Sequence, residues 1–275
     1  MCGIYFSCTH SEYKEPSVWL EKELRCRGPD HLRGLTFGPD REEPYYCPWY
    51  LTATSSVLSL RQECGAHQHV TPVTGKGISF LSWNGEVWRY SGKAVLSHDT
   101  TFIFNQLIAG ARPLTSNAPF KATSRDLAIQ SVLDVLARIS GPYAFVFYDS
   151  TRQLLFYGRD VLGRRSLLRR RVPGQSLEIA SVSGGKYDRG FEEVGADGVY
   201  VLDLALASTT GDAALLSCGR HLHESVRIPW QTSAASSNAL YRLVSLRSES
   251  NSRLISPSNL LSHPSTAHKF PRWIN

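Results

Sequence analysis

The sequence predicts an α+β fold, in which largely antiparallel sheets carry helices on their outer faces. Apolar segments before residue 206 are mostly short, rich in β-branched and aromatic residues, and bounded by Gly, Pro, Ser or Asp, which is typical of strands. Helical patterns are few and stand between blocks of strands, which favours antiparallel pairing over alternating β-α units. Hydrophobic residues form 42% of the 275 residues and charged residues 20%, which is enough for a packed core and excludes wholesale disorder.

Seven strands are predicted from the apolar segments. They cover Gly3–Ser7, Leu51–Leu60, Ile78–Trp83, Tyr143–Tyr148, Leu154–Gly158, Leu177–Ser181 and Val199–Asp203. No segment repeats at a period of 20–50 residues, so a solenoid or propeller is excluded.

Three helices are predicted from apolar residues at helical spacing. They cover Ser17–Arg27, Thr101–Ala109 and Ser124–Ile139. The third has the strongest pattern, because Ser124 is a good N-cap and Asp126 suits the first turn. Its apolar stripe consists of Leu127, Val132, Leu133, Val135 and Leu136. Gly141 and Pro142 then end the helical pattern and lead into the next strand.

The chain changes character after residue 205. Residues 232–275 hold eleven serines and three prolines, and their apolar residues are scattered. They carry five Lys or Arg against one Glu, so most of the net charge of +6 lies there and the body is nearly neutral. We expect one domain over residues 2–205 and a Ser-rich, disordered tail or truncated linker over residues 206–275. A body of this charge does not indicate a nucleic-acid partner, and the basic tail alone is weak evidence for one.

The expected cellular location is inferred from the lack of a membrane span and of a signal peptide in the sequence. No run approaches the ~18 uninterrupted apolar residues of a membrane span, and the residues after Met1 lack the basic start and apolar core of a signal peptide. The six cysteines form no Cys-x-x-Cys pair, so a zinc site is not indicated. We expect a cytoplasmic protein with no membrane partner and no metal.

The second residue has chemistry that depends on its position. Initiator methionine is generally removed when the next residue is small, which makes Cys2 N-terminal. The thiol has an ordinary pKa of about 8.5 and the α-amine one of about 7.7–8.0, so the amine can take the thiol proton. Such a cysteine carries its own general base and needs no histidine. On position alone a chance cysteine is the simpler interpretation, and the downstream segments decide between the two.

Five segments in a fixed order form a pattern that begins at this cysteine. They are Met1–Ile4, Arg27–Asp30, Trp83–Glu86, Gly141–Asp149 and Gly158–Arg165. Over roughly residues 2–205 the pattern resembles the class II, or N-terminal nucleophile, glutamine amidotransferase domain of the asparagine synthetase type, and within it the asparagine synthetase domain-containing branch. The resemblance implies a four-layer α/β/β/α sandwich with antiparallel sheets. It also implies hydrolysis of the side-chain amide of L-glutamine to glutamate and ammonia, without a cofactor.

The resemblance implies a role for each residue of the site. Cys2 is the nucleophile, and its α-amine is the base. Asn84 through its side-chain amide and Gly85 through its backbone N–H stabilise the oxyanion. Glu86 and Asp99 bind the amino-acid end of glutamine, Asp99 through the ammonium. Two local alternatives remain: an Asn-Gly pair often forms a type I′ hairpin turn, and an aspartate ahead of a predicted helix is often its N-cap.

The sequence departs from the pattern of the family at the position of one arginine. Asparagine synthetases have Arg-Leu-Ser-Ile in this strand, with the arginine on the substrate carboxylate, whereas here Val57 stands at the arginine position. Arg61 follows four residues later, about 13 Å along an extended strand but on the same face. Arg61 is therefore the expected carboxylate ligand, with an ordinary surface charge as the alternative.

Other charged and glycine-rich segments are assigned to structure rather than chemistry. Ion pairs that fix the loops around the nucleophile are expected from Arg27, Asp30, Arg159 and Asp160. The arginines at 169–171 are interpreted as a solvated basic turn. The segment Ser183–Asp188 is similar to the pyrophosphate loop of synthetases, but no helical pattern follows it, so a turn is expected.

Two functions remain open at this point. A complete asparagine synthetase needs a further domain that activates aspartate, and the residues after 205 are too few to form it. An active domain is therefore expected to pass ammonia to a separate synthetase domain. The alternative is a catalytically inactive amidotransferase-like domain that serves as an interaction module, which the valine at position 57 favours. A self-processing hydrolase is a weaker alternative, because Cys2 needs only the removal of methionine.

Overall fold

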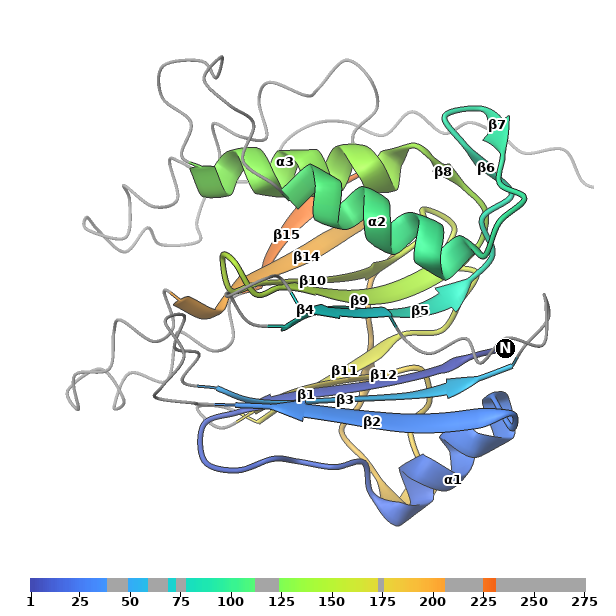
Figure 1. Ribbon diagram of the computed structural model, residues 1–275. Helices are drawn as coiled ribbons and strands as arrows, with labels where there is room; N and C mark the ends of the chain where they lie inside the picture. The colour runs from blue at the N-terminus through green and yellow to red at the C-terminus, as the bar shows by residue number, and fades with distance from the viewer. Residues whose placement is uncertain are drawn as a thin grey trace, which may run out of the picture. The chain divides into compact units, whose positions relative to one another are not determined.

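A computed structural model describes residues 1–38, 49–58, 69–72, 78–111, 124–172, 176–205 and 225–230. Across these residues, two six-stranded antiparallel sheets pack face to face, and helices cover the outer face of each (Figure 1). The predicted α+β class is confirmed, and so is the four-layer α/β/β/α sandwich expected of an N-terminal nucleophile hydrolase.

The first sheet has the N-terminal strand near its centre. In order across the sheet, its strands are β13 (Glu192–Glu193), β11 (Leu168–Val172), β12 (Ser176–Ala180), β1 (Gly3–Thr9), β3 (Tyr50–Val57) and β2 (His31–Phe37). The register places Gly3 opposite Ser56. Because Gly3 is the first residue of β1, Cys2 stands at the end of the sheet beside the last residue of β3.

The second sheet is built mainly from the middle of the chain. In order across the sheet, its strands are β15 (Val226–Pro229), β14 (Gly198–Asp203), β10 (Leu154–Arg159), β9 (Tyr143–Asp149), β5 (Ile78–Gly85) and β4 (His69–Pro72). A small third sheet consists of β7 (Lys93–Ala94), β6 (Arg89–Tyr90) and β8 (Ile139–Ser140).

The predicted helices form the outer layers. Helix α1 (Val18–Arg27) lies on the first sheet and buries Leu20 and Leu24 against Tyr5 of β1. Helices α2 (Asp99–Ala111) and α3 (Ser124–Ala137) lie side by side over the second sheet (Figure 1). These three helices have 10, 13 and 14 residues, and no helix among the described residues has the length and apolar character needed to cross a membrane.

Side-chain alternation along the strands builds the core between the sheets. Ile4, Phe6 and Cys8 of β1 point into it, and Phe80 of β5 meets them from the second sheet, with its ring 5.8 Å from that of Phe6. The strand β1 is buried on both faces because its odd-numbered residues face the α1 layer. Strand positions at this level of burial fix the register, since a slip by one residue would exchange the two faces.

The two sheets bring the start of β1 and the end of β5 to one end of the sandwich. In Figure 1 the N-terminus lies next to the arrowhead of β5. The side chain of Arg165 joins them, because its guanidinium contacts Met1 and also Glu86, the residue that follows β5. This end of the sandwich therefore carries the candidate site.

Strand β11 corrects one expectation from the sequence. Arg169, Arg170 and Arg171 lie in this strand and not in a solvated basic turn. Arg170 forms ion pairs with Glu178 of β12 and with Asp188, and Arg169 pairs with Glu192 of β13. Neutralisation by carboxylates on neighbouring segments allows a run of arginines in a sheet.

Strand β15 departs from the expectation that residues 206–275 form a tail. Val226–Pro229 pairs with β14 at the edge of the second sheet, and Ile228 is buried. The indole N–H of Trp230 donates to the carbonyl of Ala196 at 2.9 Å. A four-residue edge strand has too little periodicity to be recognised inside a polar segment.

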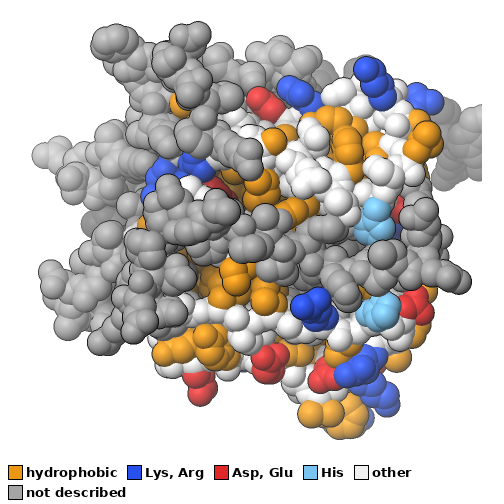
Figure 2. Space-filling view, in the orientation of Figure 1, with side chains coloured by type: hydrophobic (Ala, Val, Ile, Leu, Met, Phe, Trp, Pro, Cys, Tyr) orange, Lys and Arg blue, Asp and Glu red, His pale blue; other side chains and the backbone are white. Residues whose placement is uncertain are grey.

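Charges are mixed on the described part of the face that Figure 2 shows. Figure 2 shows acidic and basic side chains side by side over the α1 layer. One such pair is Glu21 and Arg25, which are 2.8 Å apart on successive turns of α1 and largely exposed. Pairs of this kind contribute about 0.3–0.5 kcal/mol, so they favour solubility of the helix face more than stability.

Candidate functional site

Cys2 lies at the end of β1 with its side chain directed by the strand. It precedes Ile4 by two residues, so alternation places its side chain on the inter-sheet face. Cys2 is half-buried, and its Sγ lies 4.0 Å from the carbonyl oxygen of Leu58. A side chain at Gly3 would meet the hydroxyl of Ser56 at 2.3 Å, so only glycine lets β1 begin in contact with β3.

The segment from Arg27 to Asp30 packs against the same end of β3. Gly28 ends α1 by donating its N–H to Leu24, and a Cβ at Gly28 would lie 2.4 Å from the backbone of Val57. Asp30 donates its N–H to the carbonyl of Val57 at 3.1 Å. These contacts hold Val57, which stands at the arginine position of the family, close to Cys2.

Arg27 joins this end of the site to neighbouring strands. One terminal nitrogen donates to Ser166 at 2.7 Å and to the carbonyl of Ser181 at 2.9 Å, and the other is 3.8 Å from the sulfur of Met1. Burial lowers the pKa of Arg27, the nearby Arg165 lowers it further, and the Cys2 thiolate acts in the opposite direction. Arg27 therefore positions loops through hydrogen bonds to the neutral groups of Ser166 and Ser181.

Asn84 and Gly85 are the last residues of β5, paired with Ala144 and Tyr143 of β9. They do not form the hairpin turn that their sequence also suggested. Asn84 is 2% exposed, and its Nδ2 has no hydrogen-bond partner among the described residues. A Cβ at Gly85 would lie 2.6 Å from the carbonyl oxygen of Pro142, so this position requires glycine.

The strand ladder directs the backbone N–H of Gly85. Glu86 donates its N–H to Pro142 at 2.9 Å, in continuation of the register that places Gly85 opposite Tyr143. Hydrogen-bonded and non-hydrogen-bonded pairs alternate in an antiparallel ladder. Gly85 and Tyr143 are therefore a non-hydrogen-bonded pair, and the N–H of Gly85 points away from β9. On that side, the described pairing of β5 with β4 reaches Leu81, opposite His69.

Arg165 connects the two halves of the site, and the sequence analysis assigned it no role. One terminal nitrogen is 3.1 Å from Oε1 of Glu86, and the other is 3.0 Å from the sulfur of Met1. Glu86 is held in turn by Gly141, where a Cβ would lie 2.0 Å from the Glu86 carbonyl oxygen. The only signal for Arg165 in the sequence was its place at the end of the segment Gly158–Arg165.

The loop that presents Arg165 is organised by Asp160. This buried carboxylate accepts hydrogen bonds from the backbone of Tyr143, Leu162 and Arg164, and from the side chain of Arg164 at 3.0 Å. Arg159 pairs with Glu193 at 2.6 Å. Ion pairing around the loop agrees with the structural role expected for these two residues.

Asp99 lies at the first residue of α2 and faces the segment after β5. Its Oδ1 accepts the N–H of Thr100 at 2.8 Å, and its Oδ2 accepts the N–H of Val87 at 3.1 Å. Asp99 thus lies in the first turn of α2 and not at its N-cap, because the first helical hydrogen bond runs from the N–H of Phe102 to the carbonyl of His98. Its carboxylate ties α2 to the segment that contains Glu86. Each oxygen retains a further lone pair for a ligand.

Arg61, the expected carboxylate ligand, lies outside the described residues. Within the described ranges, no group of three or more His, Cys, Asp or Glu side chains is arranged to hold a metal ion. The segment Ser183–Asp188 forms a 3-10 turn at Gly185–Tyr187, and Asp188 bonds Ser17 and Arg170, which is the structural role expected for it.

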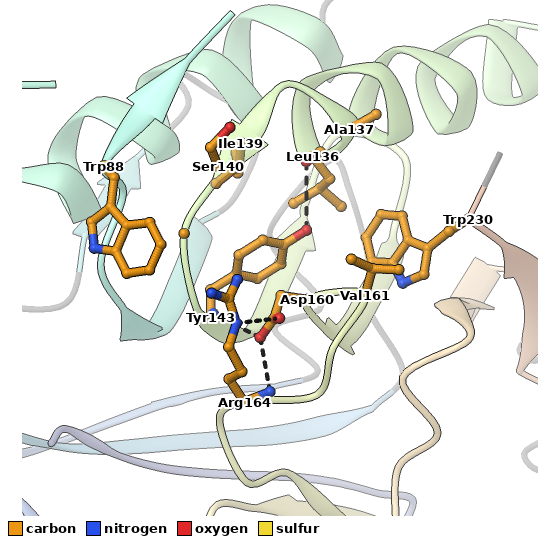
Figure 3. Close-up of a pocket in the computed structure, with 11 residues that line it drawn as sticks. Trp88, Leu136, Ala137, Ile139, Ser140, Tyr143, Asp160, Val161, Arg164 and Trp230 are labelled. Carbon is orange, nitrogen blue, oxygen red and sulfur yellow. Dashed lines mark hydrogen bonds and ion pairs between the residues drawn. The ribbon is translucent and has the colours of Figure 1, made fainter. Parts of the chain in front are cut away.

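A pocket of about 400 Å³ lies beside this site, on the helix side of β9 (Figure 3). Trp88, Tyr143 and Trp230 form aromatic walls, and Arg164 with Asp160 lies between them (Figure 3). Burial raises the pKa of Tyr143. None of the residues to which the sequence assigned chemistry lines this pocket, so it is separate from the Cys2 site.

Comparisons with known proteins show what the chain as a whole is similar to. No protein-family model matches the chain. The chain is 28% identical over 217 residues to asparagine synthetase domain-containing protein 1 of Mus musculus, which covers 78% of this chain and 30% of that protein. It is 30% identical over 168 residues to an asparagine synthetase domain-containing protein of Saccharomyces cerevisiae, covering 58% of this chain and 25% of that protein.

Among solved structures, glutamine phosphoribosylpyrophosphate amidotransferase from B. subtilis aligns with 73% of this chain and 47% of that chain, with a TM-score of 0.46 and 14% identity. The chain spans about 30% of the length of the curated relatives that match 78% of it. The predicted resemblance is thus confirmed by sequence, and over most of its length the chain is similar to the asparagine synthetase domain-containing proteins.

Proposed function

We propose that this domain hydrolyses the side-chain amide of L-glutamine to glutamate and ammonia, with Cys2 as nucleophile. The observation that carries the proposal is that β1 begins and β5 ends at the same end of the sandwich, with Arg165 in contact with both. Cys2 supplies a thiol there, and the end of β5 supplies two hydrogen-bond donors, Asn84 Nδ2 and the N–H of Gly85.

The first half of the reaction forms a thioester. Once Met1 is removed, the α-amine of Cys2 accepts the thiol proton, and the sulfur attacks the amide carbon of glutamine. The carbonyl oxygen becomes an oxyanion, which accepts hydrogen bonds from Asn84 and Gly85. The ammonium of Cys2 then gives its proton to the amide nitrogen, the carbon–nitrogen bond breaks, and ammonia leaves.

The second half regenerates the enzyme. The α-amine takes a proton from water, and the resulting hydroxide attacks the thioester carbon. The oxyanion forms again against the same donors, the carbon–sulfur bond breaks, and the sulfur recovers the proton. The balance is glutamine plus water to glutamate plus ammonia, and no cofactor enters it.

The surroundings of the reaction are part of the proposal. Glu86 and Asp99 are proposed to bind the substrate ammonium, and a separate synthetase domain is proposed to accept ammonia. A thiol nucleophile needs a reducing compartment, so the cytoplasm is the proposed location. The alternative, an inactive interaction module, is favoured by Val57 in the place of the arginine of the family.

Ammonia release tests the proposal directly. The intact mass first establishes that Met1 is absent, with methionine aminopeptidase treatment where it is present. We expect the wild type to release ammonia from glutamine and Cys2→Ala to release none, because the nucleophile is lost. Cys26→Ala, which removes an exposed cysteine of α1, is the matched control and should keep the wild-type rate. No release by Met1-free wild type would exclude hydrolysis and leave the interaction module.

A further inference from the structure

We propose that Arg165 binds the α-carboxylate of glutamine in this site, in place of an arginine at position 57, and that Met1 holds the same place until it is removed. The inference rests on the hydrolase function proposed above, and it identifies the residue that recognises the amino-acid end of the substrate.

The first step is the missing charge on β3. Val57 ends β3 beside the start of β1, because Gly3 pairs with Ser56 and Cys2 comes next. Its isopropyl side chain offers no hydrogen-bond donor to a carboxylate. A substrate carboxylate at this end of the sandwich therefore needs a cation from another element.

The second step is the supply of donors by Arg165. Its side chain is 17% exposed, and its Nε is buried without a partner among the described residues. One terminal nitrogen pairs with Glu86 at 3.1 Å, and the other contacts the thioether of Met1. A thioether is a weak acceptor, whereas a carboxylate accepts the two parallel bonds that a guanidinium offers.

The third step is the place of Met1. Its sulfur lies 3.0 Å from Arg165 and 3.8 Å from Arg27, so two cations converge on one neutral atom. Repulsion from Arg165 contributes to the lowered pKa of Arg27. An anion at this point is attracted to both arginines. Removal of Met1 vacates the point and at the same time creates the α-amine of Cys2.

The fourth step is the geometry relative to the other ligands of glutamine. Arg165 keeps Glu86 beside it, and the segment after Glu86 is tied to Asp99 through the N–H of Val87. The guanidinium of Arg165 beside Glu86, with the Asp99 carboxylate bound to the next residue, matches the carboxylate and ammonium on the α-carbon of an amino acid. The arrangement selects glutamine over an amide that lacks the α-carboxylate.

Two substrates separate carboxylate binding from a purely structural role of Arg165. Glutamine carries the α-carboxylate, and 4-aminobutanamide has the same chain, ammonium and amide without it. For Arg165→Ala we expect kcat/KM for glutamine to fall about 10- to 100-fold, mainly through KM, because a charge-assisted contact is lost. The rate with 4-aminobutanamide should stay within about twofold of wild type. Equal losses with both substrates would overturn the proposal.

Matched variants make this comparison sharper. Arg165→Lys keeps the charge but loses the planar fork, so its KM for glutamine should lie between those of wild type and Arg165→Ala. Arg25→Ala removes an exposed arginine of α1 and should leave both substrates unaffected. Thermal unfolding of each variant identifies any general loss of folding, which would lower both rates together.

Binding without turnover distinguishes this inference from the hydrolysis proposal. Calorimetry on Met1-free Cys2→Ala should detect glutamine, and the added change Arg165→Ala should weaken binding by about 10-fold or more. Protein that retains Met1, made with methionine aminopeptidase inhibited and verified by mass, should not bind glutamine. Arg165-dependent binding without ammonia release by wild type would refute hydrolysis and support this site. Binding that is indifferent to Arg165 or to Met1 would refute the inference even if the enzyme is active.

Discussion

The side-chain nitrogen of Asn84 is buried without a hydrogen-bond partner among the described residues. The side chain is 2% exposed, and no described residue accepts a hydrogen bond from its Nδ2. Leaving such a donor unpaired costs about 1–3 kcal/mol, which is a large fraction of the stability of a domain. An oxyanion formed at the end of β5 would provide the acceptor. The unpaired donor in the substrate-free protein is therefore consistent with a role of Asn84 in stabilising the transition state.

Replacement of Asn84 should therefore affect rate and stability in different directions. For Asn84→Ala we expect kcat for glutamine hydrolysis to fall about 10²- to 10³-fold, because one oxyanion donor is lost. The melting temperature should stay equal or rise, since an unpaired buried amide is removed. Thr52→Ala is the matched control, because its hydroxyl is also buried and unpaired but lies on β3, facing the α1 layer. Unchanged kcat in Asn84→Ala would exclude the amide from catalysis.

At the scale of elements, a buried network of charges joins β11 and β12 to the turn before β13. Glu178 of β12 is almost fully buried and binds Arg170 at 2.9 Å and Lys14 at 2.8 Å, and Arg170 also contacts Asp188. Burial alone would raise the pKa of Glu178, but the hydrogen bonds from Arg170 and Lys14 outweigh it and the pKa is lowered. The carboxylate thus holds these segments together only in its ionised form.

The pH dependence of unfolding tests this network. A lowered pKa in the folded state means a contribution that is present above the unfolded pKa of about 4.3 and is lost as pH falls through the folded value. We expect Glu178→Gln to lower the free energy of unfolding by about 3 kcal/mol at pH 7, because Arg170 and Lys14 each lose a charged partner. The difference in free energy of unfolding between Glu178→Gln and wild type should become smaller below about pH 4.

Urea unfolding at pH 7 and at pH 3 measures the difference in free energy of unfolding between Glu178→Gln and wild type at each pH. Glu21→Gln, which breaks the exposed pair of α1, is the control and should change stability by less than about 0.5 kcal/mol at either pH. A gap for Glu178→Gln that is the same at both pH values would contradict the assignment of stability to the ionised carboxylate.

The elements differ in how well the sequence predicts them. Strands such as β1 and β9 are buried on both faces, so their continuous apolar runs identified them directly. Strand β11 was missed because arginines occupy its centre, and the carboxylates that neutralise them come from other segments. Strand β2 was missed because it is an edge strand with largely exposed residues. In both cases the stabilising partners lie on neighbouring strands and not within the segment itself.

At the scale of the whole molecule, the site could be predicted only in part. The order of five motifs pointed to Cys2, Asn84 and Glu86, because each motif fixes its own backbone through a glycine or an acidic side chain. The contact of Arg165 with Met1 spans 164 residues and follows from the packing of two sheets, which no local pattern contains. Residues that act across the layers become visible only in three dimensions.

The extent of the folded unit makes a further prediction. The sequence predicts a domain that ends at residue 205, whereas β15 adds a strand to β14 beyond that residue. We expect a chain of residues 1–205 to unfold at a lower urea concentration than one of residues 1–230, because it exposes the edge of β14 and loses the buried Ile228. In residues 1–230, Ile228→Asp should reproduce most of this loss. Equal midpoints for the two chains would make β15 dispensable.

No residue separates Cys2 from Gly3, the first residue of β1. Because β1 begins one residue after Cys2, the direction of the thiol is dictated by the pleat of a strand that is paired on both sides. One extra amino acid inserted between them would turn the sulfur toward the opposite layer, and any fusion partner ahead of Met1 would keep the α-amine of Cys2 in a peptide bond. Purification handles for this protein therefore belong at its carboxyl end.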